Sequence, residues 1–252
     1  MQLHDIHVLI TGGGSGMGEA TALHFASLGA KISILDRDAV AAERVAQEVK
    51  GLAFACDVSD AQSVETAIAA ANKAQGIARV LVNCAGICPA KRVVGREGPM
   101  PLEEFNKVLQ VNLVGSFNTL RVMAAAAAQA ELIGEERGVI INTASVAAFE
   151  GQIGQAAYSA SKGGLVAMTL PIARELAGVG IRVMVIAPGL VETPMLAGMP
   201  AEVQQSLAAM VPFPKRLAKP KEFAHLAQHI VENAMLNGEV IRLDGAIRMQ
   251  AK

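Results

Sequence analysis

Short runs of β-branched and other apolar residues alternate with longer segments in which apolar residues recur at helical spacing. The runs are HVLIT, KISILD, GLAFACD, RVLVNCAG, GVIINTAS, IRVMVIAPG and GEVIRLDGA. The spacing between them predicts helices ending near Leu28, Lys50 and Lys73, and helices over about Leu102 to Ala130, Gln155 to Ala177 and Lys221 to Asn233. Nearly all-apolar strands that are each followed by a helix are typical of a parallel sheet covered on both faces. The pattern predicts an α/β fold, a single doubly wound Rossmann-type domain with about seven strands.

Composition is consistent with one domain and points to a small-molecule partner. The 252 residues are 52% hydrophobic, enough for one sizeable core, and no linker or repeat divides residues 1–252. The 22 basic and 23 acidic residues give a net charge of -1 without long runs of either sign, which argues against a nucleic-acid surface or a polybasic membrane patch.

Cysteine and histidine spacing does not predict a metal site. The three cysteines, Cys56, Cys84 and Cys88, lack the second pair that a zinc site needs and are too few for a disulfide framework. His225 and His229 are four residues apart, but the glutamate of the H-E-x-x-H motif and a third ligand are missing. We expect no metal.

The beginning of the chain predicts an intracellular protein. A short polar stub leads directly into the first apolar run, without the features of a signal peptide, and no apolar stretch approaches the ~20 residues that span a bilayer. The expected compartment is the cytoplasm, although a mature enzyme of the mitochondrial matrix would look the same.

A glycine-rich turn, TGGGSGMG, joins the first predicted strand to the first helix. Gly12, Gly16 and Gly18 let the backbone approach a pyrophosphate, whose charge the amides at the helix N-terminus then meet. Asp36, at the end of the second strand, can accept hydrogen bonds from both ribose hydroxyls and would repel a 2'-phosphate, which favours NAD over NADP. Arg37 beside it keeps NADP open as the alternative.

The only tyrosine of the chain, Tyr158, stands four residues before Lys162 in a predicted helix, so both side chains lie on one face. Ser145 follows the fifth strand, at the edge of the sheet where active sites of this fold gather. We expect Tyr158 to remove a proton from an alcohol, with its pKa lowered by the Lys162 ammonium and the nicotinamide charge, and Ser145 to hold the substrate oxygen. Glu150, shortly after Ser145, is expected to be a loop carboxylate near a helix start.

These motifs together resemble the short-chain dehydrogenase/reductase family over essentially the whole chain. The resemblance implies that Tyr158 is the acid/base, that Lys162 also holds the nicotinamide ribose, that Asn112 holds a water of the proton relay and that Thr193 binds the carboxamide. Cys84 replaces the second asparagine of the family's N-N-A-G, which changes the side-chain hydrogen bonding of that loop. The implied cofactor site comprises Gly12, Ser15, Gly16, Met17, Gly18, Asp36, Asp57, Val58, Asn83, Cys84, Ala85, Gly86, Tyr158, Lys162, Pro188, Gly189, Val191 and Thr193.

Longer stretches, such as NGEVIRLDGAIRMQ, resemble a narrower group in that family, the 3-hydroxyacyl-CoA dehydrogenases. This resemblance implies NAD-dependent, reversible oxidation of short or branched acyl-CoA thioesters in fatty acid metabolism by a homotetramer. Irregular segments at about 89–101 and 188–220 are the expected substrate loops. They carry possible CoA contacts at Lys91, Arg92, Arg96, Lys215 and Arg216, and a candidate apolar lid at Leu190, Val191, Met195, Leu196 and Met199, which ordinary helix packing explains equally well.

Three other functions stay open. The same catalytic group serves any secondary alcohol, so a hydroxysteroid or general alcohol dehydrogenase is the first alternative. A reductase of 3-oxoacyl carrier proteins would usually require NADPH, which Asp36 disfavours. A regulatory protein that binds NAD without turnover could dispense with Ser145, Tyr158 and Lys162.

Overall fold

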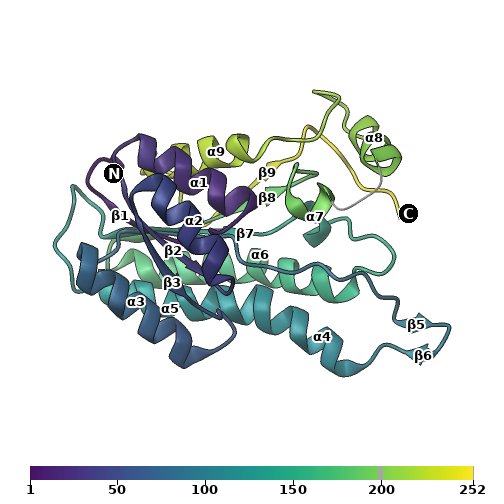
Figure 1. The fold of residues 1–252 in the computed structure, drawn as a ribbon, viewed down its shortest axis with the longest axis horizontal. Helices are drawn as coiled ribbons and strands as arrows, with labels where there is room; N and C mark the ends of the chain where they lie inside the picture. The colour runs from purple at the N-terminus through teal and green to yellow at the C-terminus, as the bar shows by residue number, and fades with distance from the viewer. Residues whose placement is uncertain (198–200, 252) are drawn as a thin grey trace.

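The computed structural model describes residues 1–197 and 201–251 and places a parallel seven-stranded sheet at the centre of the molecule (Figure 1). The strand order is β3-β2-β1-β4-β7-β8-β9. Strands β1 to β3 follow one another toward one edge of the sheet, and β4 lies on the other side of β1, so the strand order reverses between the neighbours β1 and β4. The predicted doubly wound Rossmann-type fold is confirmed. The strands are β1 (His7–Thr11), β2 (Lys31–Asp36), β3 (Leu52–Ala55), β4 (Val80–Asn83), β7 (Gly138–Thr143), β8 (Ile181–Pro188) and β9 (Val240–Leu243).

Alternate side chains of each strand enter two separate cores, as expected for a sheet covered on both faces. Val8 and Ile10 of β1 pack with α1 (Gly16–Ser27), α2 (Ala39–Val49) and α9 (Pro220–Glu232). Leu9 of the same strand packs on the opposite face with α3 (Ala61–Gln75), α5 (Gly115–Ala127) and α6 (Ala156–Ala177). Burial of both strand faces explains why the strands are apolar at nearly every position.

The predicted long helix from Leu102 to Ala130 is interrupted by a π-helical turn. It consists of α4 (Leu102–Leu109), the π turn η1 (Gln110–Val114) and α5, which ends at Ala127. Asn112 lies inside this turn and is fully buried. A widened turn of this kind often occurs at functional sites, and helical spacing alone does not predict it.

Both irregular segments contain secondary structure that the sequence pattern did not predict. Residues 89–101 include a two-stranded antiparallel hairpin, β5 (Val94–Gly95) and β6 (Gly98–Pro99). Residues 188–220 include the short helices α7 (Pro194–Ala197) and α8 (Ala201–Ala209). In the candidate lid, Val191 is buried and bridges to Ala218, whereas Met199 lies outside the described residues.

The described residues add two findings on metals and membranes. They contain no group of three or more His, Cys, Asp or Glu placed to hold a metal ion. In the same part of the chain, no helix is long and apolar enough to cross a membrane.

Candidate active site

The glycine-rich turn lies between β1 and α1, where two glycines are sterically required. Gly12 has φ +63°, and a Cβ at this position would be 2.7 Å from the backbone nitrogen of Ala85 in the loop after β4. A Cβ on Gly18 would overlap the carbonyl oxygen of Gly12. Ser15, Gly16 and the start of α1 border the cavity described below, and amides at a helix N-terminus are suited to bind a pyrophosphate.

Asp36 is fixed at the end of β2 by backbone donors. Its Oδ2 accepts a hydrogen bond from the amide of Gly14 at 2.9 Å, and its Oδ1 accepts one from the amide of Asp38 at 2.9 Å. Each carboxylate oxygen has a second lone pair, so hydrogen bonds to ribose hydroxyls remain available. The structure thus places Asp36 beside the glycine-rich turn, as predicted.

Asp57 plays a more structural part than expected. Its Oδ1 accepts hydrogen bonds from the amide and the hydroxyl of Ser59, at 2.9 and 2.6 Å, and these bonds lower the pKa of the carboxyl. Asp60 caps α3 by accepting a hydrogen bond from the amide of Gln62. Asp57 still borders the cavity described below, but one of its oxygens is committed to the turn.

Ser145, Tyr158 and Lys162 converge as the sequence predicts. Ser145 precedes the short 3₁₀ helix η2 (Val146–Ala148), where its Oγ accepts a hydrogen bond from the amide of Ala147 at 3.1 Å. This leaves the hydroxyl hydrogen free to donate, and the Ser145 side chain is close enough to Tyr158 to lower the pKa of the phenol. The Lys162 Nζ donates to the carbonyl oxygen of Thr143 at 2.6 Å and lies 5.7 Å from the centre of the Tyr158 ring.

Burial shifts the pKa values of both titratable groups of this triad. It raises the pKa of Tyr158 to about 12, and the hydrogen bond from Ser145 only partly offsets this. It lowers the pKa of Lys162 to about 8. The expected lowering of the tyrosine pKa is therefore not a property of the protein residues by themselves: desolvation of the buried phenol outweighs the opposing effect of Ser145.

Two predicted site residues, Asn83 and Asn112, lie behind the wall of the cavity. The Asn83 amide donates to the Asn142 Oδ1 at 2.9 Å, and its oxygen accepts from the hydroxyls of Thr11 and Thr119. Because these partners occupy its side chain, the Asn83 amide joins β1, β4 and β7.

Asn112 links the π turn to the two segments that flank it. Its Oδ1 accepts from the amide of Ile87 at 2.8 Å, and its Nδ2 donates to the carbonyl of Ile87 at 2.9 Å and to the Ser161 Oγ at 3.1 Å. Ser161 stands immediately before Lys162 in α6. The side chain of Asn112 thus fixes the loop after β4 against the helix that carries Tyr158 and Lys162.

A cavity of about 430 Å³ joins all these parts at the carboxyl ends of the strands, at the point where the strand order reverses. The remaining predicted residues border it, namely Gly12, Ser15, Gly16, Met17, Gly18, Asp36, Asp57, Val58, Cys84, Ala85, Gly86, Ser145, Tyr158, Lys162, Pro188, Gly189, Val191 and Thr193. Its wall also contains residues that were not predicted, among them Leu35, Ile87, Val111 and Thr143. Their position at or just after strand ends is the signal that could have identified Leu35, Ile87 and Thr143.

Cys84 stands in the loop after β4, where the resemblance places an asparagine. It is a free thiol, and its Sγ accepts a hydrogen bond from the Thr143 hydroxyl at 3.7 Å. Burial raises the pKa of Cys84 to about 12, so this thiol stays protonated at neutral pH.

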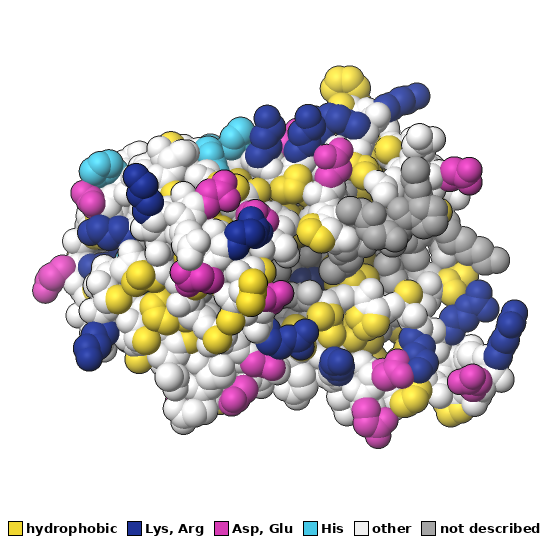
Figure 2. Space-filling view, in the orientation of Figure 1, with side chains coloured by type: hydrophobic (Ala, Val, Ile, Leu, Met, Phe, Trp, Pro, Cys, Tyr) yellow, Lys and Arg dark blue, Asp and Glu magenta, His cyan; other side chains and the backbone are white. Residues whose placement is uncertain are grey.

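The basic residues of the substrate loops are partly paired. Lys91 forms an ion pair with Glu104 at 2.5 Å, and Arg216 forms a two-bond pair with Glu222 at 2.7 and 2.8 Å. Figure 2 shows Lys and Arg side chains, interspersed with acidic ones, at the end of the molecule where the β5–β6 hairpin lies. Exposed pairs of this kind contribute little to stability.

Comparison with known proteins agrees with this geometry. Residues 6–204 match the family model described as short chain dehydrogenase. The chain is 55% identical to the 3-hydroxyacyl-CoA dehydrogenase type-2 of Homo sapiens and 54% identical to that of Bos taurus, each over 247 residues that cover 96% of this chain and 95% of the relative. A crystal structure of 3-hydroxyacyl-CoA dehydrogenase type-2 from Mycobacterium avium has a TM-score of 0.92 at 39% identity and covers 98% of this chain and 97% of that one.

Proposed function

The chain belongs to the short-chain dehydrogenase family and is an oxidoreductase, and from this premise we propose that it interconverts 3-hydroxyacyl-CoA and 3-oxoacyl-CoA thioesters with NAD as cofactor. The observation that carries the proposal is the convergence of Ser145, Tyr158 and Lys162 on the cavity that Asp36 and the glycine-rich turn also border. The thioester substrate rests on the names of the relatives, which share more than half of their residues with this chain.

The residues of the cavity fit a dinucleotide with an unmodified ribose. The glycine-rich turn offers backbone amides to the pyrophosphate, and the Asp36 carboxylate, held by the amides of Gly14 and Asp38, suits a diol but repels a 2'-phosphate. Arg37 also borders the cavity, which is why the preference for NAD needs a direct test. Bound NAD supplies the acceptor for the hydride that leaves C3 of the substrate.

The chain's own residues handle the proton. In the oxidation direction, the Tyr158 oxygen takes the proton of the 3-hydroxyl as the C3–H bond breaks, and the Ser145 hydroxyl donates a hydrogen bond to the substrate oxygen. Lys162, held by the carbonyl of Thr143, places a positive charge beside the phenol and favours its ionised form. The proton then leaves Tyr158 for solvent, so that one hydride and one proton are removed for each ketone formed.

The first experiment follows NADH consumption by the purified protein with acetoacetyl-CoA, beside NADPH and a panel of free ketones and ketosteroids. We expect fast turnover only with NADH and the thioester. Turnover of ketosteroids alone would move the assignment to a hydroxysteroid or general alcohol dehydrogenase. Tight NADH binding without any turnover would favour a non-catalytic NAD-binding protein.

Two variants test the residue roles. Tyr158→Phe should retain NADH affinity and lose nearly all turnover, because the phenol oxygen is the base; substantial residual turnover would refute that role. Asp36→Ala should weaken NADH binding and narrow the gap to NADPH, since the carboxylate both holds the diol and repels the phosphate. An unchanged ratio of the two dissociation constants would contradict the assignment.

We extend the proposal to assembly and location. A homotetramer follows from the resemblance and is supported by exposed apolar side chains along one helix, Val114 and Phe117, which are 40% and 47% exposed in the single chain. Light scattering should give four times the chain mass of 26.2 kDa. The proposed compartment is the cytoplasm, with the mitochondrial matrix as the alternative, and cell fractionation would distinguish them.

A further inference from the structure

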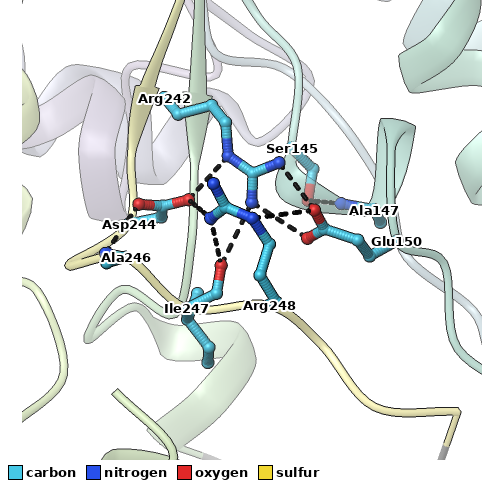
Figure 3. Close-up of polar contacts among 8 residues, drawn as sticks. All are labelled: Ser145, Ala147, Glu150, Arg242, Asp244, Ala246, Ile247 and Arg248. Carbon is cyan, nitrogen blue, oxygen red and sulfur yellow. Dashed lines mark hydrogen bonds and ion pairs between the residues drawn. The ribbon is translucent and has the colours of Figure 1, made fainter. Parts of the chain in front are cut away.

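Four charged side chains meet beside the loop that follows Ser145 (Figure 3). Arg242, from β9, donates two parallel hydrogen bonds to Glu150, from Nη1 to Oε1 at 2.8 Å and from Nη2 to Oε2 at 2.9 Å. The Arg242 Nε donates to the Asp244 Oδ2 at 2.7 Å, and its Nη2 also reaches the carbonyl of Ile247. Arg248 contacts both acids, with Nη1 3.2 Å from the Asp244 Oδ2 and Nε 3.4 Å from the Glu150 Oε1. We call these four residues the tail cluster.

The tail cluster differs from an ordinary surface pair in its burial and geometry. The side chains of Arg242 and Glu150 are 22% and 23% exposed, and that of Asp244 is 8% exposed. The hydrogen bond from Arg242 is the largest cause that holds the pKa of Glu150 below its usual range. Two parallel hydrogen bonds fix the relative orientation of the partners as well as their distance. Glu150 lies in a loop before α6, as expected, and its carboxylate also joins two segments 92 residues apart.

Glu150 also lies in the loop that connects two residues of the active site. It follows Ser145 by five positions and precedes Tyr158 by eight. Its neighbour Gly151 packs so closely on α6 that a Cβ there would overlap the hydroxyl of Ser159, the residue after Tyr158. The guanidinium of Arg242 lies 5.2 Å from the centre of the Phe149 ring, which adds a second contact with the same loop.

The C-terminal tail runs along the far end of this loop. The amide of Ile153 donates to the carbonyl of Ala251 at 3.0 Å, and the Gln152 Nε2 donates to the carbonyl of Gln250 at 3.2 Å. The loop is thus held between α6 on one side and the tail, with Arg242 and Arg248, on the other. Displacing the tail would remove contacts that hold the Ser145 end of the loop in position relative to the Tyr158 end.

We infer that Arg242 and Glu150 are positioning residues that set the placement of Ser145 relative to Tyr158, with the C-terminal tail as their support. The inference rests on the proposed roles of Ser145 and Tyr158 in hydride transfer. The hydroxyls of Ser145 and Tyr158 must both reach the substrate oxygen. A misplacement of about 1 Å lowers the rate by up to about 100-fold. The tail cluster supplies the rigidity that a connecting loop by itself lacks.

The test compares Glu150→Gln and Arg242→Lys with a matched control, Glu65→Gln. Glu65 pairs with Arg121 at 2.8 Å between α3 and α5, so the control removes an Arg–Glu pair that does not touch the loop. We expect Glu150→Gln to lower kcat with acetoacetyl-CoA about 10- to 100-fold while the NADH dissociation constant changes less than twofold. Arg242→Lys keeps the charge but cannot hold Glu150, Asp244 and Ile247 together, so we expect an intermediate loss.

A second readout does not depend on turnover. Because the chain has one tyrosine and no tryptophan, its intrinsic emission reports on Tyr158 alone. We expect acrylamide to quench this emission more strongly in Glu150→Gln than in the wild type or in Glu65→Gln. Arg248→Met, which removes the more exposed arginine, gives a milder variant should Glu150→Gln fail to fold.

The outcomes separate the two proposals. Reduced kcat together with increased quenching supports the positioning role. Wild-type kcat, or wild-type quenching in a folded Glu150→Gln protein, overturns it. If the wild type does not turn over acetoacetyl-CoA, the proposed function fails, and the quenching comparison still decides whether the tail cluster restrains the loop that borders Tyr158.

Discussion

Replacement of Lys162 by methionine tests how the active site makes a phenolate at moderate pH. Burial holds the pKa of Tyr158 at about 12. At pH 8 about one phenol in 10⁴ would therefore be ionised, and ionisation of the phenol would cost about 5 kcal/mol. The Lys162 ammonium lies 5.7 Å from the ring centre, where a unit charge contributes about 3 kcal/mol at an effective dielectric constant of about 20. Loss of that charge should raise the phenol pKa by about two units.

The expected result is a fall of about 100-fold in kcat for oxidation at pH 7, measured at saturating NAD so that weaker cofactor binding does not contribute. Burial lowers the pKa of Lys162 to about 8, so its charge is present below that pH and is lost as the pH rises through it. The ratio of wild-type to variant kcat should therefore shrink between pH 7 and pH 10.

The assay is a pH profile of kcat from pH 6 to pH 10, with Lys73→Met on α3 as a control for loss of a lysine outside the cavity. A ratio that stays constant across this range would refute the electrostatic argument, because a purely structural lysine has no reason to lose its effect near pH 8. A loss of less than threefold at pH 7 would refute the size of the effect.

Two further predictions concern stability. Arg182→Met should lower the free energy of unfolding by about 3 to 5 kcal/mol in urea titrations, because it removes the guanidinium that donates to the buried Glu136 carboxylate and leaves only the N-terminal ammonium, 3.8 Å away, as its charged partner. Arg121→Met at the surface should cost about 1 kcal/mol or less. The pKa of His7, which accepts from Ser33 and donates to the carbonyl of Gly76, is lowered by burial from its usual 6.5, so stability should fall as the pH drops below about 6.5. His7→Gln should flatten that dependence between pH 7.5 and 5.5, and an equally steep dependence in the variant would contradict the assignment.

The sequence predicts those parts of the fold that depend on local pattern. All seven parallel strands follow from apolar runs, because strands buried on both faces have almost no polar positions. The cofactor cavity follows from residues at strand ends, because the carboxyl ends of parallel strands meet at one edge. Tyr158 and Lys162 follow from helical spacing alone. Each of these predictions uses only the residues of one segment together with a general rule on how strands or helices place their side chains.

The parts that escaped prediction depend on contacts between distant segments or on small departures from regular geometry. The residues of the π turn have ordinary helical character, and its position becomes meaningful only when Asn112 is seen to hold Ile87 and Ser161. The Asn83 side chain is hydrogen-bonded to Thr11, Thr119 and Asn142, which lie in three other elements of the fold, so the residues of β4 alone do not predict these contacts. Each strand of the β5–β6 hairpin has two residues, which is too few to show an alternation of apolar and polar side chains.

Different contacts hold Tyr158 and Ser145 in place, so substitutions in different parts of the chain should affect them separately. Lys162 and Asn112 hold the helix side through bonds to Thr143 at the end of β7, to Ile87 in the loop after β4 and to Ser161 in α6. The loop side is held by the tail cluster, which depends on residues 242–251. Substitutions in the tail should therefore alter kcat without altering NADH affinity, since the Asp36 end of the cavity shares no hydrogen bond with the tail cluster among the described residues.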